Sequence, residues 1–191
     1  MPAPAKTSEA AILAAARAIL EERGLQALTM QAVADAVGVR PPSLYKRIGD
    51  RDALLARLEL DTFDRLGATL AAAGAGLSPR DALEAQAHAF RRFAGENPRA
   101  YAVIYGPDSI RGAEADAARR AAVRPALERL AALVGEARAL SAARTLTAYL
   151  HGFVSIEGAG LFRLGGDVDQ AFADGVRLIL DGIETATERD R

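Results

Sequence analysis

The segment VGVRPPSLYKRIGDRDALL, residues 37–55, concentrates positive charge in a chain of 191 residues whose formal net charge is −1. Its four cations are Arg40, Lys46, Arg47 and Arg51. Asp50 is the only anion between residues 39 and 51, so that stretch carries a local charge of +3. Guanidinium and ammonium groups bind phosphates and guanine edges, and Ser43 and Tyr45 add hydroxyl donors. Leu44 and Ile48 are four residues apart, as on the buried face of a helix.

The elements around this segment predict a helix-turn-helix. Thr29 can cap a short helix that ends at Gly38, and the next helix can start at Pro41, because proline is tolerated in a first helical turn. Ala34 is small where two crossing helices must approach each other. Helices this short are marginal alone, so their use is to display side chains. We interpret the second helix as one that binds a DNA groove. The alternative is an ordinary charged helix face in solvent, and the preceding turn and capped helix favour DNA binding.

Helical periodicity runs through the rest of the chain and predicts an all-α fold of about nine helices. Capping residues, prolines and glycines place them near 8–24, 29–38, 41–49, 50–73, 78–97, 98–105, 113–134, 141–164 and 167–188. Pro125 is expected to kink the seventh helix. Asp167 and Gln170 have the spacing of a capping box for the last helix.

Composition narrows the class of protein. The chain is 50% hydrophobic, which allows a large core, and it has no cysteine, which excludes disulfides, thiol catalysis and cysteine-based zinc sites. No apolar run reaches the ~18 residues needed to span a bilayer, so we expect a soluble cytoplasmic protein with no membrane partner. His88 and His151 are the only histidines, and hydrolase and nucleotide-binding motifs are absent. We therefore expect no enzyme activity, no cofactor and no metal site.

A family resemblance follows from two stretches, ILAAARAILEERGLQALTM and QAVADAVGVRPPSLYKRIGDRDALL. Together they resemble the DNA-binding domain of the TetR family of bacterial transcriptional regulators. The shared pattern includes Gly24, Thr29, the Gly38-Val39 turn and the Ser43-Leu44-Tyr45 triplet. The resemblance implies a helix-turn-helix DNA-binding domain with three helices in residues 1–60. A larger helical domain for ligand binding and dimerisation would then occupy residues 61–191.

The resemblance also implies roles for single residues at the DNA. Phosphate contacts are expected from Thr29, Tyr45 and Arg51. Base contacts are expected from Gln31, Arg40, Pro41, Ser43 and Lys46, with Arg47 suited to either task. Two positions depart from the family pattern, because Arg40 removes the usual side-chain cap and Gly49 replaces a bulkier residue in the turn.

The stretch AYLHGFVSIEGAGLFRLGGDVDQAFADGVRLIL resembles the C-terminal regulatory domain of one TetR subfamily. This resemblance implies a homodimer built from the last two helices. Independently, the apolar stripes on these helices are wider than one neighbour requires. The interface candidates are Phe153, Ile156, Gly160, Leu164, Phe172, Val176, Ile179 and Ile183. Packing of the same faces within one chain is the alternative.

Candidates for an effector pocket are aromatic or polar residues on helices that would surround a central cavity. They are Phe90, Phe93, Tyr101, Tyr105, His151 and Glu157. For the two phenylalanines a core role competes with a pocket role, and His151 could be a hydrogen-bonded core residue or a ligand contact. Glu157 lies on an apolar helix and needs a partner, either Arg163 or a cationic ligand.

These observations predict a regulator that binds a pseudo-palindromic DNA operator as a homodimer. We expect a repressor released by a small-molecule effector. Two alternatives stay open: a constitutive or architectural DNA-binding protein without an effector, and an activator.

Overall fold

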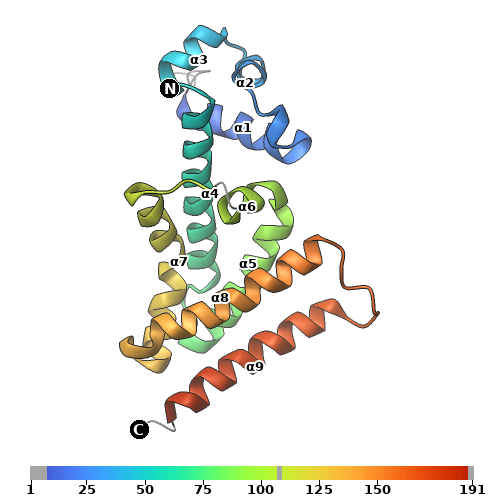
Figure 1. The fold of residues 1–191 in the computed structure, drawn as a ribbon. Coiled ribbons are helices and arrows are strands. Elements are labelled where there is room, and N and C mark those ends of the chain that lie inside the picture. The colour runs from blue at the N-terminus through green and yellow to red at the C-terminus, as the bar shows by residue number, and fades with distance from the viewer. Residues whose placement is uncertain (1–7, 107–108, 189–191) are drawn as a thin grey trace. The chain divides into compact units, whose positions relative to one another are not determined.

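The computed structural model describes residues 8–106 and 109–188, and within them it contains helices and connections but no strand (Figure 1). The all-helical prediction is therefore confirmed for this part of the chain. Its nine α-helices are α1 (Glu9–Arg23), α2 (Met30–Val37), α3 (Pro41–Ile48), α4 (Arg51–Ala73), α5 (Pro79–Glu96), α6 (Pro98–Tyr105), α7 (Ala113–Val134), α8 (Glu136–Gly158) and α9 (Val168–Glu188). A 3-10 helix, η1 (Leu25–Ala27), was not predicted.

Side-chain caps start the helices where the sequence predicted them. The hydroxyls of Ser8 and Thr29 accept from the backbone N–H of the residue three positions later, at 3.2 and 3.1 Å. The Asp50 carboxylate does the same for the first turn of α4 at 2.8 Å. Each cap satisfies one of the N–H groups that a first helical turn leaves without an intrahelical partner. Gly38 ends α2 with a φ of 73°, in the left-handed region that glycine tolerates best.

The predicted bounds of the penultimate helix were wrong at both ends. It spans Glu136–Gly158 instead of 141–164. Gly135, with a φ of 82°, separates α7 from α8 without a loop between them. At the other end the N–H of Leu161 reaches back to the carbonyl of Ile156 at 3.1 Å, and Gly160 has a φ of 65°. This left-handed closure ends α8, so Gly160 and Leu164 lie in the α8–α9 connection.

The chain divides into two compact units, residues 1–64 with 97–118 and residues 65–96 with 119–191. The first unit therefore includes residues 97–118, a segment that follows α5 in the chain. Ala100 joins the N-terminal core, and the Glu21 carboxylate accepts from its backbone N–H at 2.8 Å. The buried Glu59 carboxylate accepts from the backbone N–H of Ile110 at 2.9 Å. A functional boundary near residue 60 stays a prediction.

The core of the first unit holds α1, α2, α3 and the start of α4 together. Its fully enclosed side chains come from all four helices and include Ile12, Leu20, Leu28, Val33, Leu44, Leu54 and Leu58. The short α2 and α3 thus owe their stability to packing against the longer helices, as expected for helices of eight residues.

In the second unit α8 and α9 run side by side in opposite directions, and both pack on α5 (Figure 1). One face of α9, carrying Phe172, Val176 and Leu180, is fully buried. The rings of Phe172 and of His88 of α5 form a T-shaped pair with a centroid distance of 5.2 Å. The Tyr149 hydroxyl of α8 donates to the carbonyl of Phe172 at 3.1 Å. The ring contact therefore joins α5 to α9, and the hydrogen bond joins α8 to α9.

Gly175 allows this close approach of α8 and α9. A Cβ at position 175 would overlap the Tyr149 hydroxyl and lie 2.9 Å from Cε2 of the ring. We expect Gly175→Ala to lower the free energy of unfolding by about 1–3 kcal/mol, because the phenol must move. Gly95→Ala is the control, since nothing lies within 4 Å there and alanine should stabilise the helix by about 0.5–1 kcal/mol. Urea unfolding would measure both, and an equal effect of the two changes would contradict the expectation.

Candidate nucleic-acid interface

Helix α3 buries one face and displays the other. Leu44 and Ile48 are buried in the core of the first unit, whereas Arg40, Lys46 and Arg47 are exposed. Ser43 is also exposed, and half of the Tyr45 surface is accessible. The cations therefore lie on the solvent side of an apolar-backed helix. This arrangement can present positive charge and hydroxyl donors to a nucleic-acid groove.

The two departures from the family pattern have visible consequences at the ends of α3. Arg40 is the N-cap residue and makes no side-chain capping bond, and Pro41 opens the helix. Because Pro41 and Pro42 carry no N–H, the start of α3 needs fewer partners than an ordinary helix. Gly49 ends α3 with a φ of 100° and a ψ of −95°, which other residues rarely adopt. Glycine is therefore required for this turn.

The remaining DNA-contact candidates lie before α3 or after it. Thr29 is exposed, and its oxygen caps α2. Gln31 is also exposed, and its amide donates to the Asp35 carboxylate at 2.8 Å. Pro41 and Arg51 are half-buried. The Arg51 guanidinium donates to two backbone carbonyls, a role that the sequence did not suggest.

The six pocket candidates fall into different units. Tyr101 and Tyr105 belong to the first unit, where their ring centroids are 4.7 Å apart. Burial raises the pKa of Tyr105 to about 12, and burial together with the neighbouring Tyr105 raises that of Tyr101. The other four candidates are in the second unit. Phe90 and Phe93 are buried there, whereas His151 and Glu157 are half-buried.

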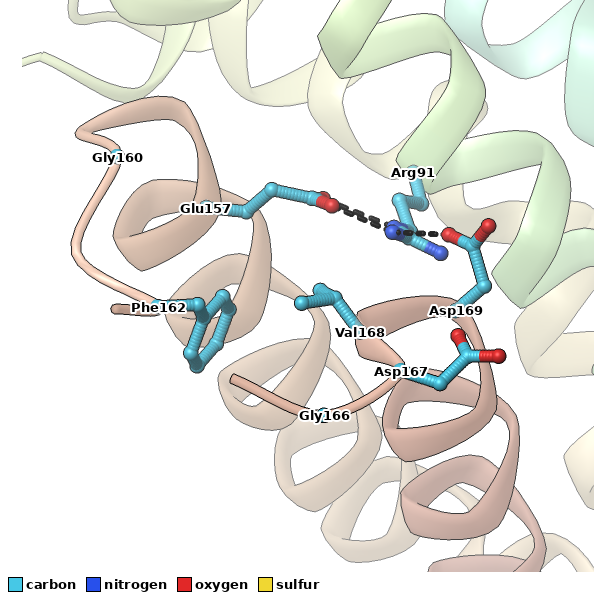
Figure 2. Close-up of a pocket in the computed structure, with 8 residues that line it drawn as sticks. All are labelled: Arg91, Glu157, Gly160, Phe162, Gly166, Asp167, Val168 and Asp169. Carbon is cyan, nitrogen blue, oxygen red and sulfur yellow. Dashed lines mark hydrogen bonds and ion pairs between the residues drawn. The ribbon is translucent and has the colours of Figure 1, made fainter. Parts of the chain in front are cut away.

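Glu157 lines a surface groove of about 370 Å³ at the α8–α9 connection (Figure 2). The groove residues are Arg91, Glu157, Gly160, Phe162, Gly166, Asp167, Val168 and Asp169. Of the six pocket candidates only Glu157 is among them. Three carboxylates and one guanidinium leave the groove a net charge of −2. Figure 2 shows the Arg91 guanidinium between the carboxylates of Glu157 and Asp169.

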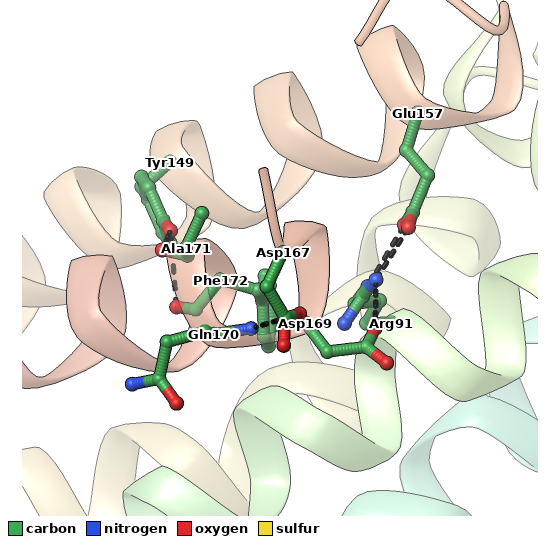
Figure 3. A network of polar contacts seen from close by, with 8 residues as sticks. All are labelled: Arg91, Tyr149, Glu157, Asp167, Asp169, Gln170, Ala171 and Phe172. Carbon is green, nitrogen blue, oxygen red and sulfur yellow. Dashed lines mark hydrogen bonds and ion pairs between the residues drawn. The ribbon is translucent and has the colours of Figure 1, made fainter. Parts of the chain in front are cut away.

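Arg91 of α5 is the centre of a polar network that joins α5, α8 and α9 (Figure 3). Its Nε donates to Glu157 at 2.8 Å, a second nitrogen also pairs with Glu157, and that nitrogen donates to Asp169 at 2.7 Å. The guanidinium also lies 4.9 Å from the ring centroid of Phe172. The hydrogen bonds to Glu157, followed by those to Asp169, raise the pKa of Arg91 despite its burial. Glu157 thus has a protein partner, and Arg163 instead donates to the carbonyl of Gly160 at 2.9 Å.

The dimer candidates differ in exposure within one chain. Phe172 and Val176 are fully buried in the core of the second unit, so the expectation that they face a partner was wrong. Gly160, Ile156 and Leu164 are exposed, and Leu164 is so completely. Phe153, Ile179 and Ile183 are half-buried. Leu178 of α9, which was not predicted, exposes 71% of its surface.

Residues 8–106 and 109–188 contain neither a helix that could span a membrane nor a cluster of metal ligands. None of the helices described there combines the length and apolar character that crossing a membrane requires. Within the same residues, no three histidine or acidic side chains are grouped so that they could hold a metal ion.

Two family models match the chain in the regions where these features lie. Residues 12–58 match the bacterial regulatory proteins of the tetR family. Residues 83–179, half of the chain, match the tetracyclin repressor-like C-terminal domain. The protein belongs to the TetR family. The helix-turn-helix and the α5–α9 region are thus the two parts of a TetR-type regulator.

Individual relatives agree with this assignment. The chain is 32% identical over 190 residues to Rv0681, an uncharacterised HTH-type transcriptional regulator of Mycobacterium tuberculosis, and the match covers 96% of this chain and 85% of the relative. A structure of a protein of unknown function from Rhodococcus sp. RHA1 superposes with a TM-score of 0.75 at 25% identity, covering 90% and 92% of the two chains. A TetR variant from Acinetobacter baumannii in complex with minocycline has a TM-score of 0.69 at 23% identity, covering 94% and 98%.

The TetR assignment decides the broad class of activity. The protein is a transcriptional regulator with a helix-turn-helix, and proteins of this family are not enzymes. The family members bind DNA, work as dimers and respond to ligands.

Proposed function

We propose that the protein is a repressor that binds a pseudo-palindromic operator as a homodimer and is released by a small-molecule effector. The observation that carries the proposal is the exposed cationic face of α3 above a fully buried Leu44. A helix of this kind places cations and short polar side chains against base edges and phosphates of the major groove. Its place of action is the cytoplasm, where the operator lies.

The proposed contacts follow from position along the helix-turn-helix. The exposed Arg40, Ser43 and Lys46 and the half-buried Pro41, at the start and outer face of α3, are assigned to bases together with Gln31 of α2. Thr29 and Tyr45 are assigned to phosphates through their hydroxyls, and Arg47 to either. A TetR-type head that binds alone is weak, so two heads reading half-sites about 34–36 Å apart supply the specificity.

The outer faces of α8 and α9 support a dimer of the second unit. On α8 the exposed residues Ser141, Thr145 and Ala148 are spaced four and three apart, as on one side of a helix. On α9 Leu178 is exposed with Gly182 four residues later. Small residues at these spacings let two helices approach closely. We propose that both faces pack on a second copy, with Ile156, Leu164, Ile179 and Ile183 around them.

We propose that the effector binds among the helices of residues 61–191, near some of the six pocket candidates. The minocycline complex of the Acinetobacter TetR variant supports a small-molecule effector for this fold. Helix α4 begins beside the helix-turn-helix and continues into the second unit, so it is the proposed carrier of the movement. The effector lowers DNA affinity by the ratio of its affinities for the two conformations.

Selection of genomic DNA fragments by the purified protein, at two salt concentrations, tests the proposal. A single inverted-repeat motif that persists at the higher salt would support a specific dimeric regulator. Binding without sequence preference that is lost with salt would contradict it, because such binding reflects phosphate charge alone. A reporter placed behind the selected operator would then separate repression from activation.

Lys46→Ala should weaken binding to that operator by about 10- to 100-fold, the cost of one lost base or phosphate contact. If Lys46 contacts a phosphate, the loss is uniform across sequences and the salt slope falls by about one unit. If it contacts a base, the preference relaxes at one position of the motif. Fluorescence anisotropy with operator variants distinguishes the two. Arg92→Ala is the control, since it removes the same charge from an exposed site in the second unit, and equal losses in both variants would contradict the assignment of α3.

A further inference from the structure

Arg51 occupies the first position of α4, directly after the turn that leaves α3. Its Nε donates to the carbonyl of Leu28 at 2.8 Å, and an outer nitrogen donates to the carbonyl of Leu25 at 3.0 Å. Both acceptors lie in the connection between α1 and α2. Leu25 opens η1, and Leu28 is the last residue before the cap of α2. One side chain therefore links the start of α4 to two carbonyls that lie 23 and 26 residues earlier in the chain.

These two bonds connect the residues just before the helix-turn-helix to the residue just after it. The motif runs from the cap residue Thr29 to the turn at Gly49 and Asp50, and residues 28 and 51 stand just outside its ends. Tying them together closes a loop that contains all of α2 and α3. A connection between the ends of a loop restricts how the loop can tilt or shift as a whole.

Apart from the Arg51 bonds, the α1–α2 connection is held by the buried Leu28 side chain and by short-range backbone bonds. The N–H groups of Ala27 and Leu28 bond three residues back, as in a 3-10 helix, and the Leu28 bond to the Leu25 carbonyl is long, at 3.3 Å. Bonds of this pattern have poorer geometry than those of an α-helix. Hydrogen bonds from a charged donor are roughly twice as strong as neutral ones. The guanidinium therefore adds two directed restraints to the residues that lead into Thr29 and the start of α2.

We propose that Arg51 is a positioning residue that holds α2 and α3 on α4 and so sets operator affinity without contacting phosphate. The proposal rests on the DNA-binding function proposed above. It replaces the phosphate contact expected at this position from the family resemblance. The planar guanidinium suits the task because its donors point in fixed directions toward two separate carbonyls, whereas a lysine ammonium is a single flexible point charge.

The test compares Arg51→Lys and Arg51→Ala with the wild type on the selected operator over a range of salt concentrations. A lysine keeps the charge that a phosphate contact needs but loses the fixed pair of donors. We expect both variants to bind at least about 10-fold more weakly, with the salt slope of the wild type. Near-wild-type binding by Arg51→Lys, with a slope lower by about one unit in Arg51→Ala, would overturn the proposal, since a lost phosphate contact has that signature.

Hydrogen exchange keeps the test decisive if Arg51→Ala does not fold. In Arg51→Lys the backbone amides of residues 27–37 should exchange faster than in the wild type, whereas those of α8 should not change. Unaltered exchange in residues 27–37 would overturn the proposal. Arg47→Lys is the matched control for the exchange measurement alone, since Arg47 is an exposed arginine of α3 outside this restraint, and residues 27–37 should exchange there as in the wild type. If the wild type selects no operator, the proposed DNA-binding function has failed, and the exchange measurement still decides whether Arg51 restrains the motif.

Discussion

Leu178→Asp should convert the protein from a dimer to a monomer. Leu178 is the most exposed large apolar side chain of α9, on the side opposite the buried Phe172, Val176 and Leu180 face. A carboxylate there would lose its water on dimerisation without a partner, which costs several kcal/mol. Within one chain the change costs little, because the side chain is already in solvent. Sedimentation equilibrium should therefore give a mass near the 20.1 kDa of a single chain.

The same variant should bind the operator on the order of 100-fold more weakly, because a monomer engages one half-site and loses the benefit of the second head. Leu77→Asp is the control. Leu77 is an exposed leucine in the α4–α5 connection, outside the proposed interface, and its change should leave the dimer intact. A Leu178→Asp protein that still sediments as a dimer would show that another surface joins the two copies.

Local sequence signals correctly predicted where the α-helices of the first unit begin and end. The caps at Ser8, Thr29 and Asp50, the glycine at the end of α2 and the prolines at the start of α3 all act on neighbouring backbone groups. Local physics is enough to position such features. The sequence also predicted which residues of α3 face solvent, because a four-residue apolar spacing on so short a helix leaves one choice of buried face.

Features that depend on distant segments could not be predicted in this way. The stripe on α9 correctly indicated burial, but periodicity does not say whether the same chain or a second copy covers a face, and Phe172 and Val176 proved to be covered within the chain. The predicted helix extended to Leu164 because apolar residues continue beyond Gly158 and Gly160. The helix in fact ends at Gly158. Arg51 showed its charge in the sequence but not its carbonyl partners, which lie more than 20 residues away.

The partner of Glu157 was missed for the same reason. Among the arginines of the chain, sequence distance favoured Arg163, whereas the fold brings Arg91 from 66 residues away. Arg91 itself gave no signal, since it is one of two adjacent arginines on an amphipathic helix. Only the packing of α5 against α8 and α9 separates it from its exposed neighbour Arg92.

Arg91→Ala should lower the free energy of unfolding by about 2–4 kcal/mol. The guanidinium side chain is only 17% exposed, and its removal leaves the half-buried Glu157 without its cation. It also removes the contact with the Phe172 ring. Arg92→Ala removes an exposed arginine from the next position and should cost less than about 0.5 kcal/mol. Urea unfolding of the two variants measures the difference, and equal losses would mean that the network contributes no more than surface charge.

A second comparison shows how much of that loss comes from the unpaired carboxylate. Replacing both Arg91 and Glu157 with leucine should lower the free energy of unfolding less than Arg91→Ala alone. The double change leaves neither member of the pair as an unpaired charge, and the leucines fill most of the space of the two side chains. The exposed Asp169 can turn to solvent in that variant. If the double variant is instead the less stable protein, the directed hydrogen bonds of the Arg91 network, and not only the pairing of its charges, hold α8 and α9 on α5.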